Sequence, residues 1–368
     1  MLGTPVEHPF SSTFRREFLG NAVTNMEEAC VLLGFLGDPQ TQHTLLRYCL
    51  DACRVTHLLR SMDTTAFGAE VIRASEAVRN ALNDAMGAGL DGDKWSQASL
   101  PLSKGGLGLK DPVLVQMAAR MSAIANFWEN AGNVGVPDAM KVVPQDFSRV
   151  VTGLRNRLGL HMEPLSTWSG GVPPPSFSKD HCSQRWWQGP IYGALSRSLC
   201  EAGSLRDRVR LGLQQARGTT QWMQVAPSEA LGSKVAGPEY RALIRWWLGV
   251  PFLSGTEVGA PCPLCSEPMD AFGDHLVCCK KNGPWQRHNA LQGVWHGAFL
   301  RAGIACRREV AVEGKERPAD LLLPSFDPKG PLAIDFTIRH PLPPSVGQHT
   351  LEGAKALLRD QEDAKVGK

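Results

Sequence analysis

The sequence lacks any long hydrophobic run, and its longest apolar stretches, such as residues 30–36, are too short to cross a bilayer. It also lacks a strong excess of either charge, since a net charge of +3 neither requires nor excludes a polyanionic partner. Met1–Phe10 contains no basic segment followed by an apolar run, so no secretory signal is expected. These absences predict an intracellular protein without a membrane partner.

The composition is that of a globular protein. A hydrophobic fraction of 43% and a charged fraction of 20% over 368 residues favour two or three folded domains over disorder. In a reducing compartment, the ten cysteines are expected as metal ligands or buried side chains rather than as disulfides. Six are scattered and predicted to lie in the core: Cys30, Cys49, Cys53, Cys182, Cys200 and Cys306. The other four cluster between Cys262 and Cys279.

Helical periodicity characterises the chain before Cys262. Asp38-Pro39 is a favourable helix start, because an acid caps the first turn and proline fits it, and apolar residues recur at helical spacing from there to Leu59. Further helices are expected at about residues 65–86, 113–130, 191–217 and 238–248. Proline and glycine interrupt the pattern at 100–109, and three consecutive prolines mark a linker at 169–178. The apolar stripes predict a helix-bundle core, and nothing in this region indicates chemistry.

The cysteine cluster has the spacing of a zinc site. A CxxC turn can present two thiolates to one ion, and an HxxxC pair that follows completes a closed tetrahedral set. The predicted ligands of a structural Zn²⁺ are Cys262, Cys265, His275 and Cys279. Gly273 is expected to turn the imidazole inward, with Asp274 as an acceptor beside it. Cys278 stays open as a substitute for Cys279, because spacing alone does not separate the two.

A helix at residues 284–302 and three strands, at 306–312, 317–323 and 332–338, are expected after this cluster. The helix face predicted to point inward consists of Leu291, Val294, Trp295, Ala298 and Phe299.

Two acids, Asp320 and Asp335, lie inside the second and third of these apolar strands. Buried carboxylates are costly unless they are paired or bound to metal, so the two are expected to meet at one end of the sheet and hold Mg²⁺ or Mn²⁺. The alternative left open is that one acid merely forms an ion pair with Arg317 or Arg339.

The order of these motifs resembles the C-terminal part of certain non-LTR retrotransposon proteins. The motifs that carry the resemblance are CxxC…HxxxC, Arg287-His288-Asn289 at a helix start, Arg317-Pro318-Ala319-Asp320 and Ala333-Ile334-Asp335. Those proteins join a zinc knuckle to a restriction-enzyme-like endonuclease of the PD-(D/E)xK kind. The resemblance therefore implies an α+β fold, helical at first, with a PD-(D/E)xK-like α/β nuclease core at its end.

The resemblance extends upstream more weakly. The segment after the polymerase palm in the same proteins is similar to Leu2–Pro5, Asp38–Gln40, Trp95 with Ala98–Leu102, and Gly105–Leu109. Their connector before the knuckle is similar to Trp222 with Tyr240–Pro251. Four parts are implied: a helical thumb-like region at 1–135, a helical connector at 136–255, a zinc knuckle at 256–283 and a nuclease-like domain at 284–368.

Roles follow from the resemblance position by position. Asp320 and Asp335 match the two catalytic metal-binding acids, and Glu309 matches a place where related nucleases carry a further acid. The residues implied to contact DNA or support the site are Arg287, His288 and Asn289. A basic cluster suited to phosphate contacts consists of Arg301, Arg307 and Arg308.

Two positions depart from the family pattern. The usual Pro-Asp is Pro318-Ala319-Asp320 here, and Thr337 stands where a lysine follows the second acid. The resemblance implies that the catalytic lysine has moved onto a following helix, with Lys365 as first choice and Lys355 as the alternative. Such a lysine would orient the attacking water or stabilise charge on the phosphorane.

The sequence contains no aromatic-x-Asp-Asp signature of a reverse transcriptase palm, so this chain is not expected to polymerise on its own. The resemblance implies a retroelement-derived fragment that nicks target DNA in the nucleus to prime reverse transcription, with DNA and element RNA as partners. Two other interpretations stay open. One is a catalytically inert, zinc-dependent nucleic-acid-binding module, and the other is a decayed or truncated reading frame.

Overall fold

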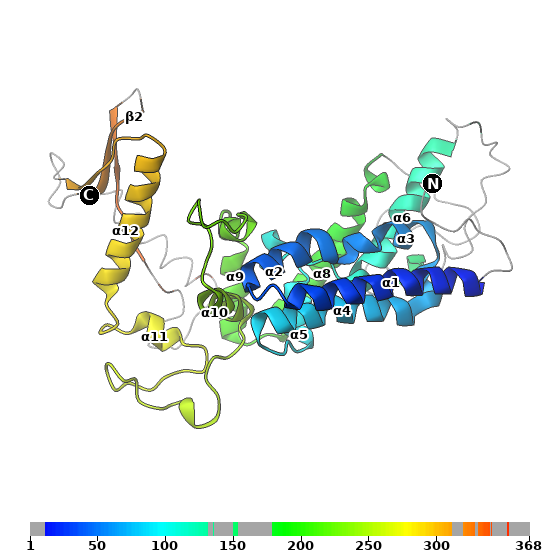
Figure 1. Cartoon of the computed structure of the whole chain (residues 1–368), viewed down its shortest axis with the longest axis horizontal. Helices are drawn as coiled ribbons and strands as arrows, with labels where there is room; N and C mark the ends of the chain where they lie inside the picture. The colour runs from blue at the N-terminus through cyan, green and yellow to red at the C-terminus, as the bar shows by residue number, and fades with distance from the viewer. Residues whose placement is uncertain are drawn as a thin grey trace. The chain divides into compact units, whose positions relative to one another are not determined.

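A computed structural model of the chain describes residues 12–131, 135, 150–153, 179–310, 319–327, 330–338, 340 and 352 (Figure 1). The chain divides into two compact units, residues 1–250 and 251–368, and each is described by itself. Among the described residues, no helix combines the length and apolarity needed to cross a membrane. The linker predicted at 169–178 and the catalytic lysines predicted at Lys355 and Lys365 lie outside the described residues.

The first unit is built from helices. Its longer helices are α1 (Ser12–Gly34), α2 (Pro39–Leu45), α3 (Thr56–Ser61), α4 (Gly68–Met86), α5 (Gly92–Ala98), α6 (Pro112–Ala131), α8 (Gln184–Ala202), α9 (Leu205–Gln214) and α10 (Gly237–Leu248). Short turns of other helix types are η1 (Leu46–Leu50), η2 (Ala52–Arg54), η3 (Thr64–Phe67), η4 (Leu102–Lys104), η6 (Lys179–Cys182) and η7 (Gln221–Gln224). The helices expected at 65–86, 113–130 and 238–248 are thereby confirmed, and the one expected at 191–217 forms as α8 and α9.

Local capping explains where several of these helices begin and end. The Asp38 carboxylate accepts the backbone N–H of Gln40 at 3.2 Å, and Pro39 occupies the first turn of α2, as the sequence predicted. Helix α10 also starts with a proline in its first turn and ends at Gly249, whose φ of +66° is the left-handed conformation that glycine tolerates.

The main core of this unit joins α1, α2, α4, α5 and α10. Tyr240, Ile244 and Trp247 of α10 pack in the same cluster as apolar side chains of α1 and α4. A second cluster joins α6 to α8 through Met121, Ile124 and Trp187 among others. Residues on both sides of the predicted 135/136 boundary therefore share one core. That boundary, with those at 255/256 and 283/284, stays a prediction of the sequence.

The continuous helical pattern expected from Asp38 to Leu59 is broken in the structure. Helix α2 passes into a turn of π-helix, and the chain becomes extended at Asp51 before a 3₁₀ turn and α3. The Asp51 carboxylate is fully buried and accepts the backbone N–H groups of Cys53 and Lys110, at 2.9 and 3.0 Å. These hydrogen bonds offer the backbone an alternative to the helical ladder, and they account for the interruption.

The scattered cysteines are only partly in the core. Cys30 and Cys306 are buried as expected, whereas Cys182 and Cys200 are half-buried. Cys49 and Cys53 are exposed, so their assignment to the core is wrong. The cause is the same break at Asp51. Because the helix ends there, Cys49 and Cys53 do not lie on one continuous apolar helix face.

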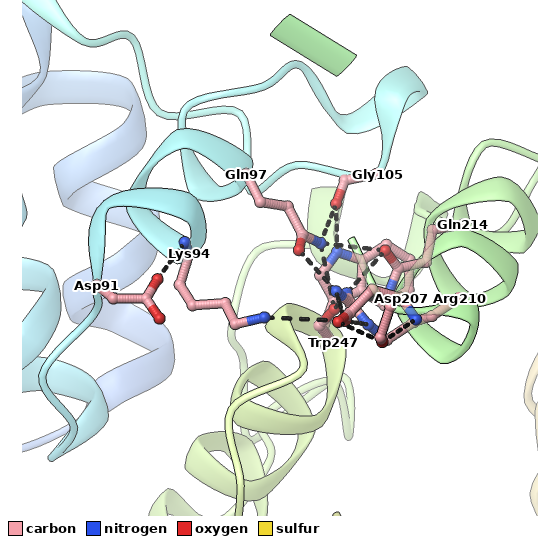
Figure 2. Close-up of polar contacts among 9 residues, drawn as sticks. Asp91, Lys94, Gln97, Gly105, Asp207, Arg210, Gln214 and Trp247 are labelled. Atoms are coloured by element: carbon pink, nitrogen blue, oxygen red, sulfur yellow. Dashed lines mark hydrogen bonds and ion pairs between the residues drawn. The ribbon is translucent and has the colours of Figure 1, made fainter. Parts of the chain in front are cut away.

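A buried polar network holds the Gly105 loop, α5, α9 and α10 together (Figure 2). The Arg210 guanidinium is only 3% exposed and donates to Asp207 Oδ1 at 2.8 Å, to Gln97 Oε1 at 3.0 Å and to the carbonyl of Trp247. Gln97 and the Trp247 indole both donate to the carbonyl of Gly105, at 3.0 and 2.9 Å. Arg210 therefore supplies the positive charge at the centre of four connected elements.

Glycine is required where this loop turns. Gly105 has a φ of +80°, and a Cβ on Gly106 would lie 1.9 Å from the carbonyl oxygen of Leu100. The Gly105–Leu109 motif is thus a tight turn that presents the Gly105 carbonyl to α5 and α10.

The second unit is α+β. It contains η8 (Gly255–Glu257), α11 (Asp274–Cys278), α12 (Pro284–Arg301) and the strands β1 (Arg307–Val310), β2 (Ala319–Asp327) and β3 (Gly330–Ile334). The strands form an antiparallel meander in the order β1-β2-β3, and α12 packs against β1 and β2 (Figure 1). The helix and three-stranded unit predicted from the sequence are confirmed. The third strand ends earlier than predicted, at Ile334, so Asp335 follows β3 and does not lie inside it.

The apolar core between α12 and the sheet is small. Cys306, Leu321 and Leu323 are buried, with Phe299, Ile304, Ile334 and Phe336 packed against them. Val294 was expected on the inner face of α12 but is 66% exposed, and the residue buried there is Gln292, at 0% exposure. The helix therefore faces the sheet with an amide in its middle and with apolar side chains only towards its end.

We predict that Arg210→Met lowers the free energy of unfolding of the chain by about 3–5 kcal/mol, because it leaves the buried acceptors of Asp207, Gln97 and Trp247 without their charged donor. Denaturant unfolding followed by circular dichroism measures the effect. The matched control is Arg208→Met on the same helix, an exposed position where a change within about 0.5 kcal/mol is expected. Equal effects of the two substitutions would contradict the structural role of Arg210.

Candidate metal centre and acidic sheet edge

Four side chains of the second unit converge on one point. The thiols of Cys262, Cys265 and Cys279 and a ring nitrogen of His275 offer ligand atoms that all lie within 4.8 Å of one another. Three of the four residues are buried, and the fourth, Cys265, is half-buried with its sulfur 3.2 Å from His275 Nε2. The predicted ligand set is therefore assembled, and it can bind a structural zinc ion.

Tight turns bring these ligands together. In the CxxC turn, the backbone N–H of Ser266 donates to the carbonyl of Cys262 at 2.8 Å. Gly273, with a φ of +74°, turns the chain into α11. The carboxylate of Asp270 then accepts the backbone N–H groups of Phe272, Asp274 and His275, at 2.8, 3.1 and 2.6 Å. Asp270, which the sequence did not single out, fixes the backbone that carries the histidine ligand.

The donor set fits zinc chemically. The backbone N–H groups of Leu264 and Cys265 lower the pKa of the Cys262 thiol to about 6, so its thiolate forms readily at neutral pH. Three cysteines and one histidine leave no position open for a substrate, which is the composition of a structural rather than a catalytic site. Cys278 is half-buried and stands outside the cluster, so the geometry favours Cys279 as the fourth ligand.

We predict that Cys279→Ser abolishes stoichiometric zinc binding, whereas Cys278→Ser retains it, because only the Cys279 sulfur belongs to the four-atom cluster. Metal content after dialysis and the visible spectrum of the cobalt-substituted protein measure the outcome. The opposite pattern, with zinc lost in Cys278→Ser alone, would overturn the ligand assignment.

The two predicted catalytic acids face each other across β2 and β3. Leu321 of β2 pairs with Ile334 of β3, and continuing this register by one residue sets Asp320 opposite Asp335. Directly opposed residues of an antiparallel pair project from the same face of the sheet. Their carboxylates interact, because Asp335 is one of the groups that raise the pKa of Asp320. The two acids thus lie close together at one end of the sheet.

The Asp320 carboxylate is held by two donors. His288 Nε2 on α12 lies 3.1 Å from Oδ2, and the backbone N–H of Phe336 donates to the same oxygen. Partial burial and the nearby Asp335 carboxylate raise the pKa of Asp320 above the ordinary aspartate value, although Phe336 and His288 oppose this shift. Both contacts fall on Oδ2, so neither occupies Oδ1.

The fully buried side chain of Gln292 links α12 to Asp320 of β2 and to Arg308 of β1 through hydrogen bonds. Gln292 Nε2 donates to the backbone carbonyl of Asp320 at 2.8 Å, and Gln292 Oε1 accepts from Arg308 Nε of β1 at 2.9 Å. The sequence analysis missed Gln292. The available signal was its position one helical turn after His288, which places the two side chains on one face of α12.

The remaining predicted site residues are distributed around this edge. Glu309 stands between the register pairs Arg308↔Leu321 and Val310↔Ala319, opposite Asp320, with a φ of +49°. Among the described residues it does not join the two aspartates in a ready metal-binding group. Arg307 is exposed, and Arg287 and Asn289 are half-buried on the first turns of α12. Arg308, also predicted to contact DNA, is exposed and donates to Gln292.

Comparisons with protein-family models, with curated proteins and with solved structures find no match for this chain.

We predict that Asp335→Asn raises the melting temperature of the metal-free protein at neutral pH. Because the pKa of Asp320 is raised in the fold, the favourable contribution of its protonated form is present at low pH and is lost as the pH rises through that raised pKa. Asp335→Asn removes the negative charge that faces Asp320, so less stability is lost as the pH rises. The gain over wild type should disappear below about pH 3, where aspartate carboxylates are protonated.

Thermal unfolding of both proteins over a pH series measures this difference. Asp93→Asn, at an exposed acid of α5, is the control and should shift little at any pH. A lower melting temperature for Asp335→Asn at neutral pH without metal would show that the two carboxylates do not repel.

Proposed function

We propose that the second unit is a metal-dependent DNA endonuclease of retroelement origin, which nicks DNA so that the freed 3′ end can prime reverse transcription. The observation that carries the proposal is the pairing of Asp320 with Asp335 across β2 and β3. Two carboxylates on one sheet face are the donor set that hard divalent cations such as Mg²⁺ and Mn²⁺ prefer. The order of motifs along the sequence supplies the retroelement part of the proposal.

The repulsion between the two acids supports a cationic occupant. Partial burial is the largest cause of the raised pKa of Asp320, and the neighbouring Asp335 carboxylate raises it further. Like charges set opposite each other also destabilise a sheet. A divalent cation between the carboxylates would remove the repulsion. When bound there, it supplies a Lewis acid that polarises the phosphodiester and readies a water for attack.

His288 is proposed as the residue that orients Asp320. Its Nε2 lies 3.1 Å from Oδ2, and Phe336 donates to the same oxygen, so the orientation of the carboxylate is fixed. A fixed carboxylate loses less conformational freedom when it binds a cation. Arg287, Asn289 and Arg307 lie near enough in sequence to contact phosphates of a bound strand, and Lys365 or Lys355 would supply the lysine of the reaction.

A second function, binding nucleic acid without cleaving it, is favoured by one observation. Among the described residues, the only group of three or more metal-type donors that converges is the zinc cluster, and the acidic edge offers two carboxylates with Glu309 apart from them. If this second function is the true one, the zinc-binding segment and the nearby arginines bind phosphates, and Asp320 and Asp335 bind no cation.

Nicking of supercoiled plasmid by the full chain, with Mg²⁺ or Mn²⁺, separates these functions. We expect Asp320→Ala and Asp335→Ala to lower the nicking rate at least about a hundredfold, and His288→Ala to lower it about 10–100-fold, since His288 acts through Asp320. Asp93→Ala, an exposed acid in the first unit, is the matched control and should nick as wild type does.

DNA binding by each variant is measured in parallel. Retained binding with no metal-dependent nicking by the wild-type protein would favour the binding function and reject the endonuclease. Nicking activity that is retained in both alanine variants would show that the reaction occurs at another site or comes from a contaminating nuclease.

A further inference from the structure

A buried contact joins the turn that carries the zinc ligand His275 to the segment that follows β3. His340 Nε2 lies 3.3 Å from Asp274 Oδ1, and the two side chains are only 6% and 8% exposed. Neither residue has a role in the zinc ligand set or in the acid pair. Removing one member of a close buried polar pair is costly, because the other is left without its partner. The contact is therefore expected to hold its two segments in fixed positions.

Each end of this contact is tied closely to one of the two sites. Asp274 precedes the ligand His275, and the backbone N–H groups of both residues donate to the same Asp270 carboxylate. His340 lies shortly after Asp335, in the segment that leaves β3. A shift of the zinc turn would thus be passed through Asp274 and His340 to the chain that carries Asp335.

A second connection runs along the backbone on the other side. The chain passes from the ligand Cys279 directly into α12, and Asn282 Nδ2 donates to the carbonyl of Leu276 in α11 at 2.8 Å. Gly283 then turns with a φ of +51° into the helix that bears His288. The zinc cluster is thus linked to His288 by a short capped turn and to Asp335 by the buried contact.

We propose that Asp274 and His340 form a clasp through which zinc binding positions the Asp320–Asp335 edge. In this proposal the zinc module is part of the framework of the catalytic centre as well as a possible nucleic-acid contact. Asp274 and His340 are positioning residues, since they touch neither the acids nor a substrate. The catalytic consequence rests on the proposed endonuclease function, whereas the structural coupling does not.

Substitution of His340 in the full chain tests the clasp. His340→Phe keeps a buried ring but removes the polar contact, whereas His340→Gln keeps a donor amide that reaches a similar distance. We expect His340→Phe to retain one equivalent of zinc while the amides of residues 330–338 exchange about tenfold faster, as the loss of a buried polar contact would produce. His340→Gln should restore much of the protection.

The control is His296→Phe, at a half-buried histidine of α12 in the same unit, for which no change in exchange at 330–338 is expected. Unchanged exchange in His340→Phe, or equal changes in both variants, would overturn the proposal. Far-ultraviolet circular dichroism and zinc content show that each variant is folded.

A double-mutant comparison tests whether zinc acts through this contact. Cys279→Ser, which removes a zinc ligand, should also speed exchange at 330–338, and adding His340→Phe should produce little further change because the two share one path. Independent, additive effects would show that zinc does not act through the clasp, and the proposal would fail.

Nicking assays on the same variants separate this proposal from the endonuclease function. If the wild-type chain nicks, His340→Phe should lower the rate about tenfold or more with zinc still bound, and His340→Gln should recover part of it. If the wild-type chain does not nick, the endonuclease function fails. The exchange measurements then still support or overturn the clasp.

Discussion

A close pair of carboxyl groups is the feature around which the polar contacts at one end of the sheet in the second unit are arranged. Asp320 and Asp335 face each other at the end of β2 and β3, although opposed like charges weaken a sheet. His288, the Phe336 N–H and Gln292 all direct donors towards Asp320 or its backbone. A sheet selected only for stability would place neutral or opposite side chains there.

The first unit shows a different use of buried charge. Arg210 is enclosed by Asp207, Gln97, Gln214 and the Trp247 carbonyl, so its guanidinium is satisfied by several acceptors at once. Such a network specifies one arrangement of α5, α9, α10 and the Gly105 loop, because an apolar contact tolerates rotation and sliding that directional hydrogen bonds do not. Elements far apart in the sequence are thereby fixed relative to one another.

Patterns local in sequence predicted most of the secondary structure and the zinc ligands. Capping at Asp38, the periodicity of α4, α6 and α10, and the CxxC and HxxxC spacings each depend on neighbouring residues. Burial partners depend on the whole fold, and there the predictions failed: Asp51 ends a helix by bonding Lys110, and Gln292 replaces Val294 on the inner face of α12. The contact of Asp274 with His340 joins residues that no spacing rule relates. The domain boundaries and the lysine assignment stay predictions.

The outer strands of the meander, β1 and β3, carry features that oppose edge-to-edge pairing with a strand of another molecule. On β1, the run Arg307-Arg308-Glu309 is charged and twisted by the positive φ of Glu309, and on β3 Pro331 has no N–H to offer a neighbour. An incoming strand from another molecule would meet charge and a kink on one side and a missing donor on the other. Among the described residues, these features oppose edge-to-edge pairing of β1 or β3 with a strand of another molecule.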